Sequence, residues 1–146
     1  MFKNKVRVVS LCLLVAALTV CTESQTESQT KSQVNLAVDV ATFDQAIKKE
    51  MAVEGQAVLL DVRTPEEFKQ GHIAGAELMN FHDPNFQARL GKLAKDKTYL
   101  VYCRSGGRSG KTAKMMKELG FVRVYDLAGG MIDWNKKSMP VKKNQE

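Results

Sequence analysis

The segment TYLVYCRSGGRSGKT, residues 98–112, places a strand, a tight loop and the start of a helix in immediate succession. Residues 98–102 are β-branched, aromatic or aliphatic, which predicts a buried strand. From Ser109 onward, apolar residues recur at helical spacing and predict a helix. Its inner face is expected to contain Ala113, Met116 and Leu119. The segment is therefore a strand–loop–helix unit with Cys103 at its junction.

Cys103 lies where a thiolate would be stabilised. The residues that follow it are Arg104, Ser105, Gly106, Gly107, Arg108 and Ser109. The N–H groups of such a loop can converge on the sulfur, the helix N-terminus is partially positive, and two arginines are close. The glycines allow positive φ angles and close backbone approach. We interpret this loop as an anion-binding site around a nucleophilic cysteine.

Two other interpretations fit parts of the loop. A cysteine after an apolar strand can be simply a small core residue, although the flanking glycines and arginines disfavour this. The run SGGRSGKT ends in Gly-Lys-Thr, as a phosphate-binding P-loop does, but that motif needs a glycine where this chain has Ser105. A P-loop would also leave Cys103 without a role.

The N-terminus has the order of a bacterial export signal. The basic start MFKNKVR leads into an apolar run at residues 8–20, which is too short to span a bilayer comfortably. The run ends in LTVC, which resembles a lipoprotein cleavage site with Cys21 as the lipidated residue. Val20 departs from that pattern, so cleavage nearby by an ordinary signal peptidase is the alternative. We expect export to the cell envelope, with a periplasmic domain attached to the membrane only through the lipid.

If the signal is removed and Cys21 is lipidated, Cys103 is the only free thiol of the mature protein. Residues 22–33 read TESQTESQTKSQ, a polar repeat that cannot bury a core and is typical of a flexible tether. We therefore predict a signal peptide at 1–21, a tether at 22–34, one folded domain at 35–140 and a tail at 141–146.

Composition excludes a nucleic-acid-binding role. The 146-residue chain carries a formal charge of +6, but Lys3, Lys5 and Arg7 belong to the export signal. Without these three, 19 basic and 16 acidic side chains remain, a net charge of +3. The sequence also has no basic stripe with interleaved aromatic residues.

Strand and helix patterns alternate along the domain. Strands are predicted near 36–40, 57–62, 76–80, 98–102 and 122–127. Helix starts are predicted at a Thr42–Gln45 capping box, at Thr64-Pro65 and at Asp83-Pro84, and a last helix at 130–136. The helix after Asp83-Pro84 is expected to reach Leu93. This alternation indicates an α/β fold with a mainly parallel sheet and helices on both faces. Ligands bind such folds at the carboxyl ends of the strands, where Cys103 lies.

Three segments together resemble the rhodanese (thiosulfate sulfurtransferase) domain. They are Asp61-Val62-Arg63 with Glu67-Phe68, Gly71-His72-Ile73 and Gly75-Ala76; the loop CRSGGRS at 103–109; and Gly129-Gly130 with Trp134. The resemblance implies a five-stranded parallel sheet flanked by helices. It also implies that Cys103 takes a sulfur atom from thiosulfate as a persulfide and passes it to cyanide, a thiol or a protein thiol, without a metal or cofactor.

The resemblance assigns roles around Cys103. Arg108 matches the arginine that closes the family's loop, and we expect its side chain to act on the bound anion. Arg104 is expected from its charge to attract the donor. Four residues separate Cys103 from Arg108, as in sulfurtransferases, whereas the related phosphatases have five. A structural set of ion pairs and hydrogen bonds is expected from Asp61, Arg63, Glu67 and His72. The alternative function is a non-catalytic persulfide carrier or partner-binding module.

Overall fold

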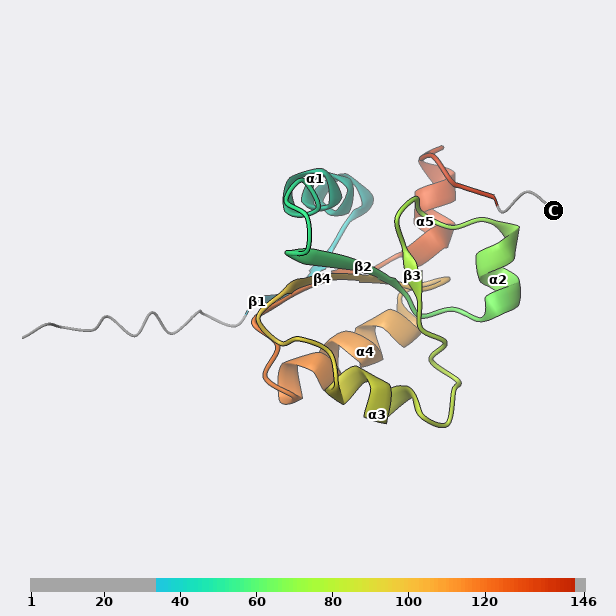
Figure 1. Ribbon diagram of the computed structural model, residues 1–146. Helices are drawn as coiled ribbons and strands as arrows, with labels where there is room; N and C mark the ends of the chain where they lie inside the picture. The colour runs from blue at the N-terminus through green and yellow to red at the C-terminus, as the bar shows by residue number, and fades with distance from the viewer. Residues whose placement is uncertain (1–33, 144–146) are drawn as a thin grey trace, which may run out of the picture.

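The computed structural model describes residues 34–143 (Figure 1). The strands are β1 (Val34–Val38), β2 (Ala57–Asp61), β3 (Glu77–Leu78), β4 (Thr98–Tyr102) and β5 (Arg123–Leu127). The helices are α1 (Val40–Glu50), α2 (Pro65–Gln70), α3 (Phe86–Gly91), α4 (Gly107–Glu118) and α5 (Gly130–Lys136). Within the described range, no helix is both long and apolar enough to cross a bilayer. The predicted export signal, lipidation site and most of the tether lie outside these residues.

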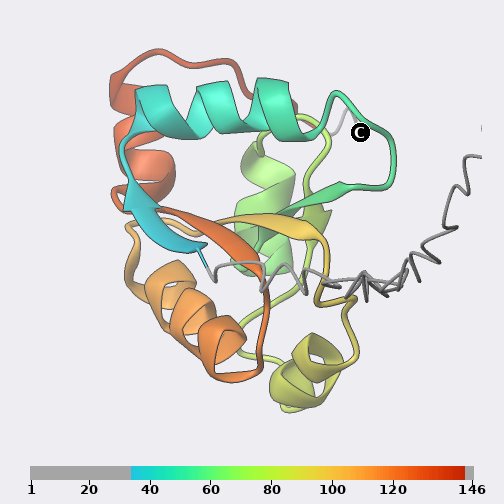
Figure 2. The ribbon, with the colours of Figure 1, turned by 90° about the vertical axis from the view of Figure 1, so that its left-hand side faces the viewer.

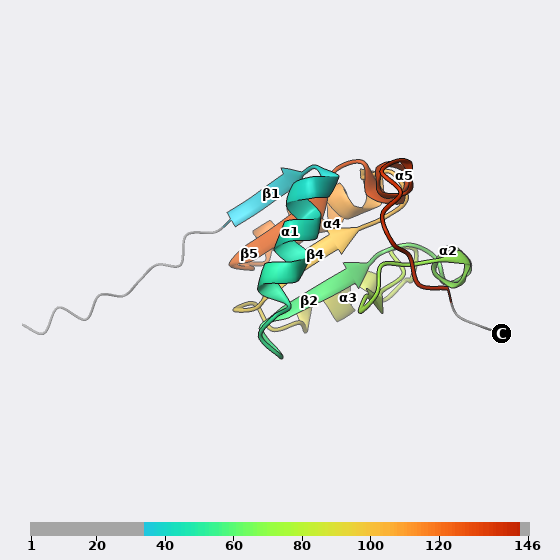
Figure 3. The same ribbon diagram turned by 90° about the horizontal axis from the view of Figure 1, so that it is seen from above.

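All five strands are parallel and form one sheet in the order β1-β5-β4-β2-β3. Strand β4 is central, with β2 on one side and β5 on the other, and Figure 3 shows the strands pointing the same way. All five positions of β4 are buried. This confirms the predicted fold class, a parallel sheet with helices on both faces.

Two helices cover each face of the sheet. Helices α1 and α5 lie over one face, and α3 and α4 over the other (Figures 1 and 2). On the first face, Trp134 of α5 meets Phe43 of α1 edge to face, with ring centroids 6.4 Å apart. On the second, Tyr99 of β4 meets Phe121 in the same way at 5.1 Å. Alternate residues of β4 contribute to the two cores, because successive side chains of a strand point to opposite faces.

The first helix begins earlier than predicted. Thr42 was expected to cap it, but the cap is Asp39, whose carboxylate accepts a hydrogen bond from the Thr42 N–H at 2.9 Å. This hydrogen bond satisfies one of the first N–H groups of the helix, which have no partner within it. The helix therefore starts at Val40. At α2, in contrast, the predicted cap is confirmed, and Thr64 and Glu67 form a reciprocal capping box.

Three other boundaries differ from the predictions. Asp83 caps the turn before α3 by accepting from the Asn85 N–H, so the helix begins at Phe86, and it ends at Gly91 rather than at Leu93. The third strand shrinks to Glu77–Leu78 because it pairs only with β2, at the edge of the sheet. Leu119 follows the last residue of α4 and is 37% exposed, so it does not share the buried face of that helix.

Candidate active site

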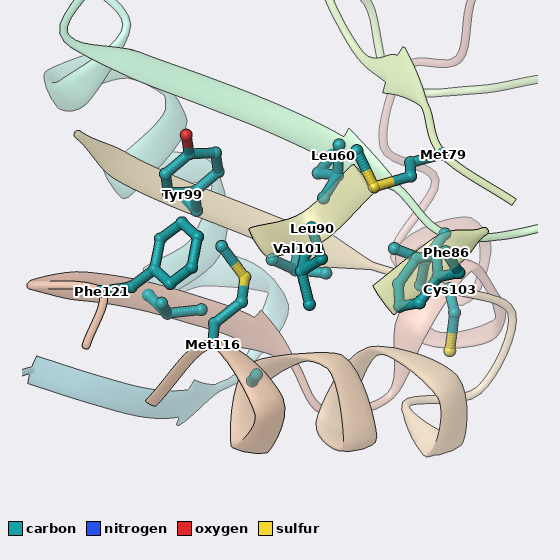
Figure 4. Close-up of a cluster of buried hydrophobic side chains, with 12 residues drawn as sticks. Leu60, Met79, Phe86, Leu90, Tyr99, Val101, Cys103, Met116 and Phe121 are labelled. Atoms are coloured by element: carbon teal, nitrogen blue, oxygen red, sulfur yellow. The ribbon is translucent and has the colours of Figure 1, made fainter. Parts of the chain in front are cut away.

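Cys103 directly follows β4, at the carboxyl end of the central strand. It is 1% exposed and lies at one end of the α3–α4 core, away from Tyr99 and Phe121 (Figure 4). Helix α4 starts four residues later, at Gly107 rather than at the predicted Ser109. The strand and the helix therefore hold the thiol between them, at the end of the sheet where this fold class binds ligands.

The loop turns back on the sulfur through Gly106, whose φ of 86° is left-handed. The Gly106 N–H donates to Cys103 Sγ at 3.1 Å, and the Ser109 hydroxyl donates to the same sulfur at 3.4 Å. A side chain at position 106 would be blocked, because a Cβ there would come 1.7 Å from the carbonyl oxygen of Ala128. The predicted need for glycine is confirmed at this position. Gly107, in contrast, has open space around it.

The environment of Cys103 favours its ionised form. Burial is the largest single influence and by itself raises the pKa of the thiol. The opposing influences are hydrogen bonds from the Ser109 hydroxyl and from backbone N–H groups at Ser109, Ser105 and Arg108. Together they outweigh burial, and the pKa of Cys103 is lowered from its ordinary value. The expected convergence of loop donors on the sulfur is therefore present.

The outer side of the same loop is fastened to α5. The Met131 N–H donates to the Cys103 carbonyl at 2.8 Å, and the Ile132 N–H to the Arg104 carbonyl at 3.0 Å. Gly130 allows this approach, since it has a φ of 56° and a Cβ there would lie 2.5 Å from the Cys103 oxygen. Two N–H groups of a helix start, which have no partner within the helix, are thus satisfied by the loop. In the sequence, only the resemblance to the rhodanese domain pointed to Gly130, the second residue of Gly129-Gly130.

Arg108 is held by a carboxylate. Its guanidinium donates to both oxygens of Glu67, at 2.7 and 2.8 Å. The sequence predicts that Arg108 acts on the bound anion; in the structure both of its terminal nitrogens donate to the Glu67 carboxylate, a partner that the sequence did not indicate. Glu67 in turn belongs to the capping box of α2, so the pair fastens the first turn of α4 to that helix.

The remaining predicted residues separate into two groups. Arg63 donates to both oxygens of the Asp61 carboxylate and to the Gly71 carbonyl, and the pair is buried. His72 stacks on Phe68 with ring centroids 3.8 Å apart. These contacts agree with a structural role, whereas Glu67 pairs with Arg108 rather than with Arg63. Of the other loop residues, Arg104, Ser105 and Gly107 are exposed.

We expect Arg63→Met to lower the free energy of unfolding by about 3–5 kcal/mol, because it leaves the Asp61 carboxylate buried without a cation. Urea denaturation at neutral pH measures the change. Arg89→Met is the matched control, since the Arg89–Asp83 pair is solvent-exposed and contributes about 1 kcal/mol at most. Equal losses in the two variants would contradict a special role for the buried pair.

Glu67→Gln should make the domain less sensitive to acid. The hydrogen bonds from Arg108 lower the pKa of Glu67 from 4.5 to about 2. A depressed carboxyl pKa stabilises the folded state above pH 4.5, and this stabilisation is lost as the pH falls through about 2. Urea midpoints measured from pH 6 to about pH 2 should therefore fall less steeply in Glu67→Gln than in the wild type. Parallel curves would show that the pair does not contribute.

The family model of the rhodanese-like domain matches residues 40–137. The chain belongs to the rhodanese family. Two curated relatives illustrate the match. The sulfurtransferase of Allochromatium vinosum is 32% identical over 97 residues, which cover 66% of this chain and 89% of that protein. Thiosulfate sulfurtransferase 16, chloroplastic, of Arabidopsis thaliana is 37% identical over 93 residues, covering 57% of this chain and 78% of that one.

Solved rhodanese structures share the fold. The rhodanese-related protein of Thermoplasma volcanium superposes with a TM-score of 0.60 at 27% identity. The match covers 73% of this chain and 96% of that structure. The region covered by the family model begins at the first residue of α1 and ends one residue after α5, and it includes the whole Cys103 loop.

Proposed function

We propose that this rhodanese transfers a sulfur atom from thiosulfate, or a similar anionic donor, to a thiophilic acceptor through a persulfide on Cys103. The observation that carries the proposal is the geometry at Sγ, which accepts hydrogen bonds from Gly106 and Ser109 and has a lowered pKa. A structural core cysteine needs neither donor. The relatives named as sulfurtransferases support the general activity, and thiosulfate is our proposal for the donor.

The chemistry balances within the site. The Cys103 thiolate attacks the outer sulfur of thiosulfate and forms a new S–S bond, while the original S–S bond breaks and its electron pair leaves with sulfite. The terminal sulfur of the persulfide carries negative charge, which the converging N–H groups can stabilise. A thiolate or cyanide then attacks that terminal sulfur and regenerates the Cys103 thiolate.

Two arginines have different parts in this proposal. Arg104 directly follows Cys103 and is exposed, so its charge can attract a dianionic donor from solution. Arg108 is paired with Glu67 and holds the loop closed. Removing Arg104 should therefore weaken donor binding, whereas removing Arg108 should disturb the loop itself.

Intact mass after incubation with thiosulfate tests the proposal. The protein should gain one sulfur atom, and cyanide should remove it. A non-catalytic carrier would also gain the sulfur, so the rate of release to the acceptor separates the two functions. An unmodified mass, with Cys103 still open to alkylation, would contradict both and leave only the fold.

We also propose that Cys21 attaches the protein to a membrane of the cell envelope. The support is the order of basic start, apolar run and cysteine, followed by the polar repeat. Cys21→Ser should move the protein from the membrane fraction to the soluble fraction without changing sulfur transfer. A wild-type protein that is soluble and cleaved at another residue would contradict this attachment.

A further inference from the structure

Asp126 is a carboxylic acid in the interior that the proposed chemistry has not used. It lies on β5 and is 6% exposed. Val124, two residues earlier, belongs to the same core as Cys103, and the alternation of a strand places Asp126 on that face, beneath α4. The first turn of α4 is close, because a Cβ on Gly110 would lie 3.3 Å from Asp126 Oδ2.

This carboxyl group is poorly satisfied. Across residues 34–143, its Oδ1 is the one buried side-chain nitrogen or oxygen atom without a hydrogen-bond partner. Burial raises the pKa of Asp126, and a hydrogen bond from Ser109 lowers it by a smaller amount. The backbone neighbours in register on β1 and β4, Ala37 and Val101, do not titrate. A buried acid without a cation is costly when ionised, so such a group readily holds a proton.

Ser109 connects this acid to the nucleophile. Its hydroxyl lies 3.4 Å from Cys103 Sγ and 3.2 Å from the Gly106 carbonyl oxygen. Ser109 also directly precedes Gly110, the residue of α4 at which a Cβ would lie 3.3 Å from Asp126 Oδ2. A serine hydroxyl has a single hydrogen, so it can donate to only one of these groups at a time. Where that hydrogen points therefore depends on whether Asp126 is ionised.

We propose that Asp126 and Cys103 share one proton through the Ser109 hydroxyl, with Asp126 as a positioning residue that holds the proton when the thiolate forms. This inference rests on the proposed nucleophilic role of Cys103. In the step, the thiol proton passes to Ser109 Oγ while the serine proton passes to the Asp126 carboxylate. The net charge of the site is unchanged. Protonated Asp126 then donates to Ser109 Oγ, and the serine hydroxyl donates to the thiolate.

Sharing a proton has a measurable signature. Two strongly coupled acids titrate in two steps that belong to the pair, and each negative charge opposes the formation of the other. The rate of Cys103 alkylation by iodoacetamide should therefore rise with pH through two inflections in the wild type. Peptide mass spectrometry restricts the measurement to Cys103, since Cys12 and Cys21 could also react in the full chain.

Asp126→Asn keeps the shape of the side chain and removes its charge. We expect its alkylation profile to have a single inflection, about one pH unit below the upper inflection of the wild type. Below the inflection of the variant, the thiolate fraction of Cys103 should therefore be roughly tenfold larger than in the wild type. Asp96→Asn is the matched control, because Asp96 is an exposed carboxylate before β4, and its profile should match the wild type. One inflection in the wild type, superimposed on that of Asp126→Asn, would overturn the proposal.

The path through Ser109 is tested by repeating the comparison in Ser109→Ala. If the proton is shared through this hydroxyl, Asp126→Asn should shift the profile much less in that background. An equal shift in both backgrounds would mean that Asp126 acts by its charge alone, and the proposal of a shared proton would be wrong. The two-step wild-type profile needs no variant, so poor folding of Asp126→Asn leaves the test intact. Thiosulfate is absent throughout, and so a failed sulfur transfer would not affect the result.

Discussion

Cys103→Ser should reduce sulfur transfer from thiosulfate to the background of the assay. A serine hydroxyl stays protonated in this loop and is a poor nucleophile toward sulfur, so the first S–S bond cannot form. Thiocyanate production from thiosulfate and cyanide gives the rate, and intact mass should show no added sulfur. The effect should be the largest of any single substitution in the chain.

The same substitution should leave the fold in place. Oxygen and sulfur differ modestly in size, and the Gly106 and Ser109 donors can bond to a hydroxyl as well as to a thiol. Its melting temperature should therefore remain close to that of the wild type. Cys21→Ser leaves Cys103 in place and serves as the comparison, since it should retain full transfer. Activity that survives in Cys103→Ser would place the nucleophile elsewhere.

Gly106→Ala should be the second most damaging change. Alanine at a φ of 86° costs about 1–2 kcal/mol, and its Cβ would also collide with the Ala128 carbonyl. The loop can accommodate it only by moving, which withdraws the Gly106 N–H from Sγ. Loss of one such preorganised donor reduces rates on the order of 10²–10³-fold. We expect a loss of this size in persulfide formation, together with a lower melting temperature.

Gly107→Ala is the matched control, one residue away. Apart from its chain neighbours and the backbone of its own helix, no atom lies within 4 Å of a Cβ at position 107, and alanine favours the helix that begins there. Its transfer rate and melting temperature should be equal to the wild type or slightly higher. If the two alanine variants behave alike, the left-handed turn at Gly106 is not what aligns the donors on the sulfur.

The sequence predicted the central parts of the fold because their signals are local. The apolar run of β4 and the span of α5 were predicted with the bounds observed. Helix starts were less accurate, since a cap depends on which nearby side chain reaches the first amides. At α1 that side chain is Asp39 rather than Thr42.

The site was predictable where it depends on chain order and not where it depends on distant contacts. Loop donors around Cys103 follow from a cysteine between a strand and a helix. The Arg108–Glu67 pair joins residues 41 positions apart, and no local pattern specifies it. The burial of Asp126 could not be predicted either, because an acidic residue in a strand is expected to face solvent unless the position of the helix that covers it is known.

The hydrogen bonds from α5 to the Cys103 and Arg104 carbonyls make the last helix and the Cys103 loop one cooperative unit. Release of α5 by local opening frees both carbonyls. The Arg104 carbonyl shares its peptide with the Ser105 N–H, which is one of the donors to the sulfur, so this donor would lose its alignment. Such openings require less free energy than global unfolding. On heating, catalysis would therefore disappear before the parallel sheet melts, and the amides of Met131 and Ile132 would exchange with solvent in step with that loss.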